Sequence, residues 1–203
     1  MEIVLATRNS GKVQELRRLL EGLPITVLFL EDFREIPEVV EDGETYEENA
    51  VKKAREVAAA TGRMVLADDS GLEVDALQGG PGVHSARWSG EELTDHERYM
   101  KLLEKLQDTP EDERGALFRC TIAIATPRKI LKVVQGTCRG SIVSSPQGAG
   151  GFGYDPVFMP VGYNHTFAEL SPEVKNRISH RARALEKAAL FLEGYVHSSL
   201  EEG

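Results

Sequence analysis

Positive charge, cysteine and long apolar runs are all scarce in this sequence. The 203 residues hold 24 Lys and Arg against 33 Asp and Glu, which gives a formal net charge of −9 at pH 7. This balance argues against a broad nucleic-acid interface, which needs a basic face to neutralise phosphates, but it allows one small anionic ligand. No apolar run approaches the roughly 18 residues that a membrane helix needs, so no membrane span is expected.

The two cysteines point to a reducing compartment. Cys120 and Cys138 fall on strand-like segments joined near residues 127–129, where a tight hairpin would offset the two sulfurs. Residues 1–6 enter an apolar strand with no basic region before it, so no signal peptide is expected. We therefore predict reduced, buried thiols in a cytoplasmic protein. The length and the 41% hydrophobic content suit a single domain over residues 1–203, with no separable linker.

One stretch organises the rest of the chain. Residues 64–67 form a short apolar run that stops at two adjacent carboxylates, Asp68 and Asp69, followed by Ser70-Gly71. The run predicts a buried strand, and Ser70-Gly71 predicts the turn that ends it. Both carboxylates would then project from the carboxyl edge of an α/β sheet, where such folds bind ligands and where Mg²⁺ would relieve their repulsion. The alternative is a polar turn with no ligand.

The first loop predicts an anion site. A strand over residues 3–6 is followed by Thr7-Arg8-Asn9-Ser10-Gly11-Lys12 and then by a helix whose apolar residues are Val13, Leu16, Leu20 and Leu23. A polar loop that leads from a strand into a helix aims free backbone N–H groups at an anion. The spacing is not that of a Walker loop. An ordinary strand-to-helix turn with a solvated Lys12 remains the alternative.

An acidic connector and a second helix follow. The connector, residues 31–44, offers several carboxylates, most of which are expected to be solvated. Thr45 and Glu48 have the spacing of a capping box, which predicts a helix start. On that helix Lys53 lies near the apolar edge, from where its long stem reaches towards a cleft.

Two later segments carry further candidates. A glycine-rich loop, residues 147–156, surrounds Phe152, so the backbone could approach a ligand while the ring stacks on it. The alternative is a long hairpin loop with Phe152 in the core. Ser179-His180-Arg181 begins the last helix near Lys175, and it reads either as a polar ligand edge or as an ordinary surface start. Strands alternating with helices, and then a hairpin, predict a mixed α/β fold with an appended lobe.

Taken together, four motifs resemble the inosine triphosphate pyrophosphatase family, in particular its bacterial dITP/XTP pyrophosphatase branch. The likeness runs from Ile3 to about Leu192, and it rests on Thr7-Arg8-Asn9-Ser10-Gly11-Lys12, Ala67-Asp68-Asp69-Ser70-Gly71, Gly151-Phe152-Gly153-Tyr154-Asp155-Pro156 and Ser179-His180-Arg181. The resemblance implies an elongated, twisted mixed sheet flanked by helices, in two lobes with the active site in the cleft between them. It also implies a homodimer.

The resemblance further implies Mg²⁺-dependent hydrolysis of non-standard purine nucleoside triphosphates (ITP, dITP and XTP) to the monophosphate and pyrophosphate. Such an enzyme keeps these nucleotides out of DNA and RNA. Two other functions remain open: a non-catalytic purine nucleotide sensor, and a septum-inhibitor-like pyrophosphatase of modified pyrimidine nucleotides. The metal carboxylates speak against the first, and the Ser-His-Arg and glycine-rich motifs do not fit the second.

The family's functional residues map onto this sequence. Glu41, Asp69 and Asp68 would hold the metal, Asp69 being also the proton acceptor in catalysis with Asp68 beside it. Glu41 is chosen among the connector carboxylates by its distance in sequence from Lys53. Phe152 would stack on the purine. The remaining substrate contacts would be Thr7, Arg8, Asn9, Ser10, Gly11, Lys12, Lys53, Ser70, Gly153, Tyr154, Asp155, Lys175, His180 and Arg181.

Overall fold

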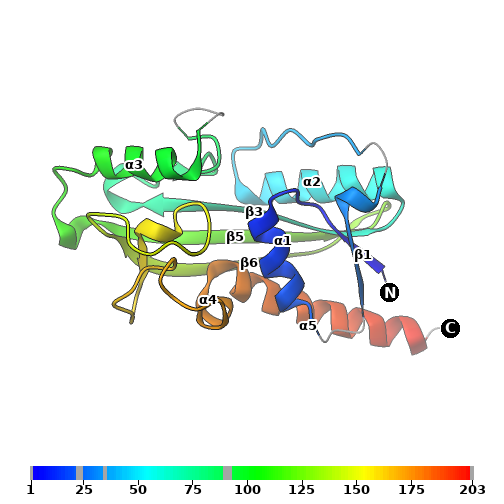
Figure 1. The fold of residues 1–203 in the computed structure, drawn as a ribbon. Helices are drawn as coiled ribbons and strands as arrows, with labels where there is room; N and C mark the ends of the chain where they lie inside the picture. The colour runs from blue at the N-terminus through cyan, green and yellow to red at the C-terminus, as the bar shows by residue number, and fades with distance from the viewer. Residues whose placement is uncertain (1, 22–24, 34–35, 89–92, 202–203) are drawn as a thin grey trace. The chain divides into compact units, whose positions relative to one another are not determined.

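The computed structural model of the chain describes residues 2–21, 25–33, 36–88 and 93–201. Helices and strands alternate along the chain and then give way to a long hairpin (Figure 1). In order, the elements are β1 (Glu2–Leu5), α1 (Ser10–Leu19), β2 (Thr26–Phe29), α2 (Tyr46–Thr61), β3 (Met64–Val74), β4 (Pro81–Gly82), α3 (Asp95–Lys105), β5 (Gly115–Ala125), β6 (Ile130–Ile142), β7 (Phe158–Pro160), α4 (Pro172–Ile178) and α5 (His180–Glu201).

The strands form one mixed sheet. Their order is β2-β1-β3-β5-β6-β7, with β4 paired to β3. β1 runs parallel to both β2 and β3, with Val4 opposite Val65, whereas β3–β4 and β6–β7 are antiparallel pairs. The predicted mixed α/β class is therefore confirmed.

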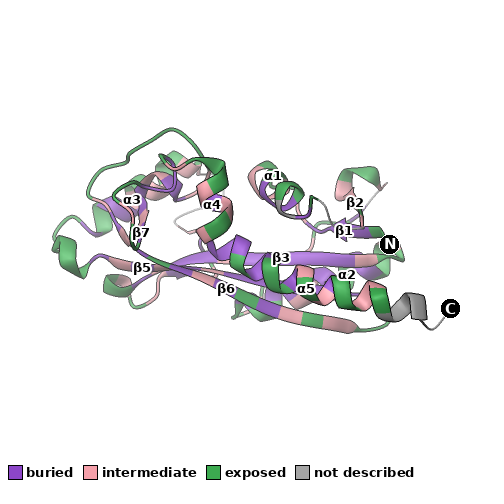
Figure 2. Ribbon diagram, turned by 90° about the horizontal axis from the view of Figure 1, so that it is seen from below, coloured by how far each residue is buried: buried purple, intermediate pink, exposed green. Residues whose placement is uncertain are grey.

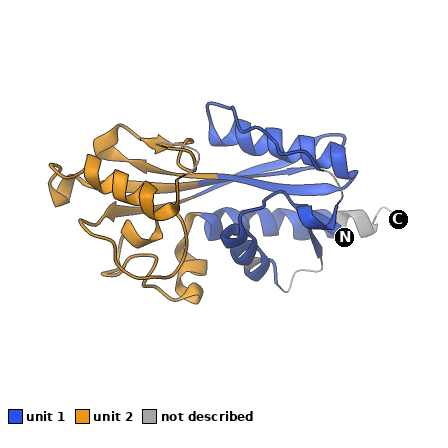
Figure 3. Cartoon of the chain, turned by 45° about the horizontal axis from the view of Figure 1, so that its top comes forward, with its two compact units in different colours: residues 1–69, 120–136, 181–203 blue, residues 70–119, 137–180 orange. Residues whose placement is uncertain are grey.

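The chain divides into two compact units (Figure 3). Unit 1 comprises residues 1–69, 120–136 and 181–203, and unit 2 comprises residues 70–119 and 137–180. The boundary falls within β3, β5 and β6, so that each of these strands contributes to both units. Each unit has an apolar core of its own.

Unit 1 has a three-layer core. Successive side chains of a strand point to opposite faces of the sheet. Accordingly Leu5 and Leu66 pack with α1 and α5 on one face, while Val4 and Val65 pack with α2 on the other. Helices on both faces are what a parallel sheet requires, because its strands are apolar on both sides.

Unit 2 is built differently. The inward side chains of β3, Leu72 and Val74, pack with Leu102 of α3 and with Phe158 and Phe167. On β3 the intervening Glu73 is half-buried and forms a bidentate ion pair with Arg119 of β5. This part of the sheet therefore alternates apolar and polar positions, as sheets with one solvent-exposed face do.

The course of β3 corrects one prediction. Ser70-Gly71 does not end the strand, because β3 runs without interruption from Met64 to Val74. The strand continues because of tertiary packing: Leu72 and Val74, on the same face of β3, are buried in the core of unit 2. The Leu72 N–H also donates to Ser85 Oγ (2.8 Å). Figure 2 shows β3 purple, that is buried, along most of its length.

The helix starts predicted at Thr45 and at Ser179-His180-Arg181 are confirmed. Thr45 and Glu48 form a reciprocal capping box at α2, and Gly62 ends that helix in the left-handed conformation. Ser171 caps α4, with Pro172 as its first residue, and α5 begins at His180. Val13, Leu16 and Leu20 belong to α1 or its C-cap, whereas Leu23 lies outside the described residues.

Both cysteines are buried and neither is in a disulfide, as predicted. Cys120 packs in unit 1 and Cys138 packs in unit 2. Among the residues that the structure describes, no helix has the length and apolar character of a membrane span.

The capping box of α2 generates a first prediction, because this helix carries two residues of the candidate site. Thr45→Ala should lower the free energy of unfolding by about 1 kcal/mol, since it leaves the Glu48 N–H without its acceptor. Urea denaturation measures the change. Thr45→Asn, which restores a capping oxygen, should recover most of it. Equal midpoints for the Ala variant and the parent would contradict the role of the cap.

Candidate functional site

The two predicted metal carboxylates lie next to each other on β3 but on opposite faces of the sheet. Asp68 shares the face of Leu66 with α1 and α5, whereas Asp69 shares the face of Val65 and Ala67 with α2. Both side chains are buried. The strand pleat therefore gives each carboxylate a different environment. These environments, and not the mutual repulsion expected at a strand end, set the pKa values of the two groups.

Asp68 is surrounded by cations. Lys12 Nζ lies 2.9 Å from Asp68 Oδ2, and Arg181 Nε lies 3.4 Å from the same oxygen. Burial by itself raises the pKa of Asp68, but the charges of Lys12, Arg181 and Lys53 outweigh it and hold that pKa well below its usual range. Asp68 therefore stays ionised at any physiological pH.

Arg181 is the centre of a buried ion cluster. Its guanidinium donates to Glu15 on α1 as well as to Asp68 on β3, and it comes from the second residue of α5. Burial opposes the positive charge, yet the carboxylates of Glu15 and Asp68 raise the Arg181 pKa above its usual value. Its predicted contact with the substrate stays a prediction, while its structural contacts join three elements of unit 1.

Asp69 has the opposite character. Asn49 Nδ2 on α2 donates to Asp69 Oδ2 (3.0 Å). Burial, followed by the negative charge of Glu41, raises the pKa of Asp69 to about 6, against the attraction of Lys12 and Lys53. A carboxylate whose pKa lies close to neutrality can both hold and release a proton under working conditions, as a general base must.

Glu41 and Lys53 lie close to Asp69. Lys53 Nζ donates to Glu41, which is half-buried at the end of the acidic connector. Burial lowers the pKa of Lys53, but the charges of Asp68, Glu41 and Asp69 outweigh it and raise the pKa above its usual value. Lys53 is therefore a fixed positive charge among three carboxylates.

The loop before α1 is built as the sequence predicts. Asn9 caps the helix by accepting from the Lys12 N–H (3.0 Å), and Thr7 Oγ1 accepts from the Asn9 N–H (3.2 Å). Ser10 is the first helical residue and Gly11 the second. Arg8 donates instead to the carbonyl of Ile36 (2.9 Å), so its side chain stabilises the connector. The positive end of α1 and Lys12 remain suited to an anion.

The residues also fit a hard divalent cation. Glu41 and Asp69 are close enough for one charge to raise the pKa of the other, and oxygen ligands of this kind suit Mg²⁺. Within the described ranges, no three His, Cys, Asp or Glu side chains form a metal-binding group. Mg²⁺ needs only one or two carboxylates when phosphate oxygens and water complete its shell. Glu41 and Asp69 are the pair that would hold it.

In unit 2 the glycine-rich loop presents an aromatic ring. Phe152 is half-buried rather than enclosed in the core, and Lys175 Nζ lies 4.8 Å from its ring centroid. Asp155 accepts from the Phe152 N–H (2.9 Å) and from Lys175. Gly151 makes this possible, since its φ is +73° and a Cβ there would lie 2.0 Å from Asp155 Oδ2.

His180 and Tyr154 occupy defined places in the same unit. The His180 ring stacks on Phe118, with centroids 4.5 Å apart and planes 8° from parallel. Tyr154 is buried and donates from its hydroxyl to the Ser85 carbonyl (3.0 Å), and burial raises its pKa to about 12. Tyr154 thus supports the loop from inside, and Ser70 is half-buried on β3.

The structure adds residues that the sequence interpretation missed. Asn49 bonds Asp69, and Glu15 bonds Arg181. A signal for both was present, because Asn49 precedes Lys53 by four residues and Glu15 follows Lys12 by three, which are same-face spacings on a helix. Asp95, which bonds the Gly153 N–H (2.8 Å), carries no such signal.

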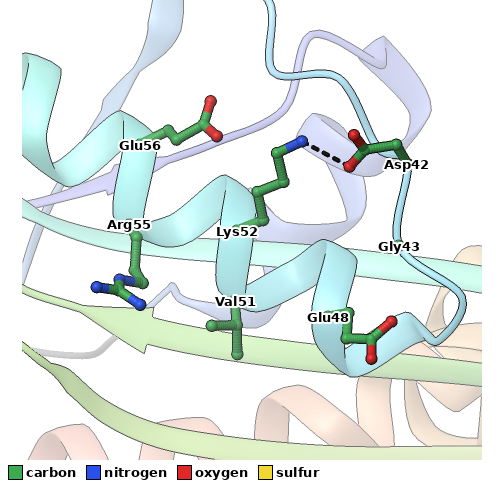
Figure 4. Close-up of a pocket in the computed structure, with 7 residues that line it drawn as sticks. All are labelled: Asp42, Gly43, Glu48, Val51, Lys52, Arg55 and Glu56. Carbon is green, nitrogen blue, oxygen red and sulfur yellow. Dashed lines mark hydrogen bonds and ion pairs between the residues drawn. The ribbon is translucent and has the colours of Figure 1, made fainter.

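A separate pocket of about 530 Å³ lies beside the outer face of α2 (Figure 4). It is lined by Asp42, Gly43, Glu48, Val51, Lys52, Arg55 and Glu56. Lys52 pairs there with Asp42. None of the predicted site residues lines it, because Asn49 and Lys53 are on the buried face of the same helix.

These features define a class of protein. A mixed α/β sheet, a polar loop at a helix N-terminus and buried carboxylates beside lysines are typical of α/β proteins that bind phosphorylated ligands. The family model described as "Ham1 family" matches residues 3–191. The chain belongs to this family.

Relatives and solved structures agree with this assignment. The chain is 54% identical over 183 residues to "dITP/XTP pyrophosphatase" of Geobacter sulfurreducens, covering 90% of this chain and 92% of that protein. It is 50% identical over 201 residues to the protein of the same name from Desulforamulus reducens, covering 98% and 100%. A HAM1 protein structure from Coxiella burnetii is 43% identical, with a TM-score of 0.87 over 96% of this chain and 99% of that one. The resemblance predicted from the four motifs is confirmed.

The raised pKa of Asp69 predicts a pH-dependent effect on stability. The folded pKa is about 6 and the ordinary value 3.8, so ionising Asp69 destabilises the fold progressively as pH rises through this range. Without added metal, Asp69→Asn should therefore stabilise the protein at pH 8 by about 2–3 kcal/mol, and by little near pH 4. Urea denaturation with a chelator at both pH values measures this. A gain in stability that did not depend on pH, or that the exposed Asp112→Asn also showed, would mean that the ionisation of Asp69 is not its cause.

The buried cluster at Arg181 predicts a loss of stability. Arg181→Met removes the cation that Glu15 and Asp68 share, so it should destabilise the fold by about 3–5 kcal/mol. Thermal and urea unfolding report the change. Arg55→Met, at an exposed position of α2 in the same unit, is the matched control and should change stability by less than about 0.5 kcal/mol. Similar losses for the two variants would show that the buried cluster is not what matters.

Proposed function

We propose that this protein is a nucleoside triphosphate pyrophosphatase of non-standard purine nucleotides. It hydrolyses the bond between the α- and β-phosphates of ITP, dITP and XTP and releases the monophosphate and pyrophosphate. Curated relatives at about 50% identity over nearly the whole chain bear the name dITP/XTP pyrophosphatase. The observation that carries the proposal is the pair on β3, where Asp68 is held ionised among cations while Asp69 has a pKa near neutrality.

The residues of unit 1 suit the triphosphate. Hydrolysis between the α- and β-phosphates requires neutralisation of charge that builds up on the polyphosphate. The N-terminus of α1, Lys12 and Lys53 supply positive charge on this side of the reaction. Mg²⁺, held by Glu41 and Asp69, would add a Lewis acid when bound.

Asp69 suits the role of the group that receives a proton. An attacking water must be oriented and partly deprotonated, and a general base works best when its pKa lies near the operating pH. In the metal-free protein a carboxyl with a pKa of about 6 is mostly ionised at pH 7.5 and can therefore accept a proton. The Asn49 amide fixes one of its oxygens, which leaves the carboxylate in a set orientation.

The residues of unit 2 suit the base. Phe152 offers a half-buried ring for stacking, and Lys175 and His180 stand among the aromatic side chains nearby. A 6-keto purine presents acceptors at O6 and N7, which cationic or N–H donors match. Adenine presents an amino donor there, and the unpaired donors would cost roughly 1–3 kcal/mol. Rejection of guanine has to come from a contact at the 2-position.

The alternatives fit less well. A non-catalytic purine sensor needs the loop at α1 and the Phe152 ring, but it has no use for a second carboxylate whose pKa lies close to neutrality. A pyrophosphatase of modified pyrimidines would not need the aromatic loop of unit 2. We propose further that the enzyme acts in the cytoplasm as a homodimer and keeps non-standard nucleotides out of DNA and RNA.

A direct assay tests the proposal. The purified protein is incubated with Mg²⁺ and, separately, ITP, XTP, GTP, ATP and modified pyrimidine triphosphates, and the products are identified. We expect monophosphate plus pyrophosphate from ITP and XTP, with GTP and ATP nearly inert. Orthophosphate with a diphosphate would mean that another bond is cleaved, and binding without product would favour the sensor.

Two controls sharpen the assay. Asp69→Asn should abolish turnover of ITP while the protein stays folded, because the variant keeps the acceptor for Asn49 but has no basic oxygen. A chelator should stop the parent enzyme, and added Mg²⁺ should restore it. Turnover by Asp69→Asn would show that Asp69 is not the proton acceptor. Full activity in the chelator would show that the reaction does not require the metal.

A further inference from the structure

The carboxylate of Asp95 is not needed for the helix that it begins. The N-terminus of α3 is already capped, since Thr94 Oγ1 accepts from the Glu97 N–H (3.2 Å) and the Glu97 carboxylate accepts from the Thr94 N–H (2.8 Å). Asp95 instead uses its two oxygens elsewhere. Oδ1 forms an ion pair with Arg98 (2.7 Å), and Oδ2 accepts from the backbone N–H of Gly153 (2.8 Å).

The bond to Gly153 joins segments 58 residues apart in the chain. Gly153 has a φ of +62°, a left-handed conformation that glycine adopts readily because it has no Cβ. A hydrogen bond to a carboxylate is shorter and stronger than one to a neutral acceptor. Asp95 therefore supplies an anchor at a glycine, a residue whose own backbone offers little conformational restraint.

Phe152 lies between two such anchors. Its own N–H donates to Asp155, and the next N–H, that of Gly153, donates to Asp95. Arg98 in turn holds Asp95 from the following turn of α3. Both peptide groups flanking the Cα of Phe152 are thus fixed by buried or half-buried carboxylate oxygens, and the ring is constrained at its base.

We infer that Asp95 is a positioning residue for purine binding: it holds the Gly153 N–H so that the Phe152 ring is preorganised to stack on the base. The inference rests on the proposed function of Phe152. A ring that is already oriented loses less conformational freedom when the nucleotide binds, and this saving increases affinity. The effect belongs to the base and not to the phosphates, so a ligand without a base does not benefit.

The test measures binding in the Asp69→Asn background, where turnover does not interfere. Dissociation constants are determined for ITP and for inorganic tripolyphosphate, in buffer with Mg²⁺. Asp95→Ala should weaken ITP binding about tenfold and leave tripolyphosphate binding within twofold. Asp95→Asn keeps a neutral acceptor and should lose about threefold. Asp112→Ala, which removes an equal charge from an exposed position of the same unit, should change neither.

A double-mutant cycle with Phe152→Ala shows whether Asp95 affects ITP binding through the Phe152 ring. If Asp95 acts through the ring, Asp95→Ala has no further effect on ITP binding once Phe152 is absent. In the otherwise unmodified enzyme, Asp95→Ala should raise KM for ITP about tenfold and change kcat by less than threefold. Equal losses for ITP and tripolyphosphate, additive losses with Phe152→Ala, or Ala and Asn variants that match Asp112→Ala would each overturn the inference. An unmodified enzyme that fails to hydrolyse ITP and XTP would instead overturn the proposed function.

Discussion

The pleat of β3 is the constraint on which the rest of the site depends. Because side chains alternate across a strand, two carboxylates that are neighbours in sequence are separated by the plane of the sheet. One joins Lys12 and Arg181 and is kept ionised, while the other joins Asn49 and Glu41 and has a pKa near 6. A turn after Ala67 would have given both side chains a similar, wetter environment, and the division of roles would be lost.

The remaining elements of unit 1 are arranged around these two faces. On one face α1 and α5 bring cations to Asp68, and on the other α2 brings Asn49 and Lys53 towards Asp69. The cations offset the burial of the carboxylates, which would otherwise be strongly unfavourable in an apolar core. The same charges are those that a polyphosphate requires, so the stability of the fold and the proposed chemistry draw on one set of side chains.

Local signals in the sequence predicted most of the elements, and tertiary packing explains why the turn predicted at Ser70-Gly71 does not form. The capping boxes at Thr45 and Thr94 act over three residues, so they could be recognised without a fold. Ser70-Gly71 resembles a turn, yet the apolar residues beyond it keep the strand extended. Contacts such as those of Asp95 with Gly153 depend on how distant segments pack, and no spacing in the sequence encodes them.

The contact between Arg181, Glu15 and Asp68 also orders events during synthesis. The three residues come from the first helix, the central strand and the last helix, and unit 1 is assembled from three separate stretches of the chain. A ribosome releases these stretches one after another. Until residue 181 has emerged, Glu15 and Asp68 lack their shared cation. The nascent chain therefore cannot complete its charge-balanced core, and with it the proposed catalytic apparatus, before the start of α5 has emerged.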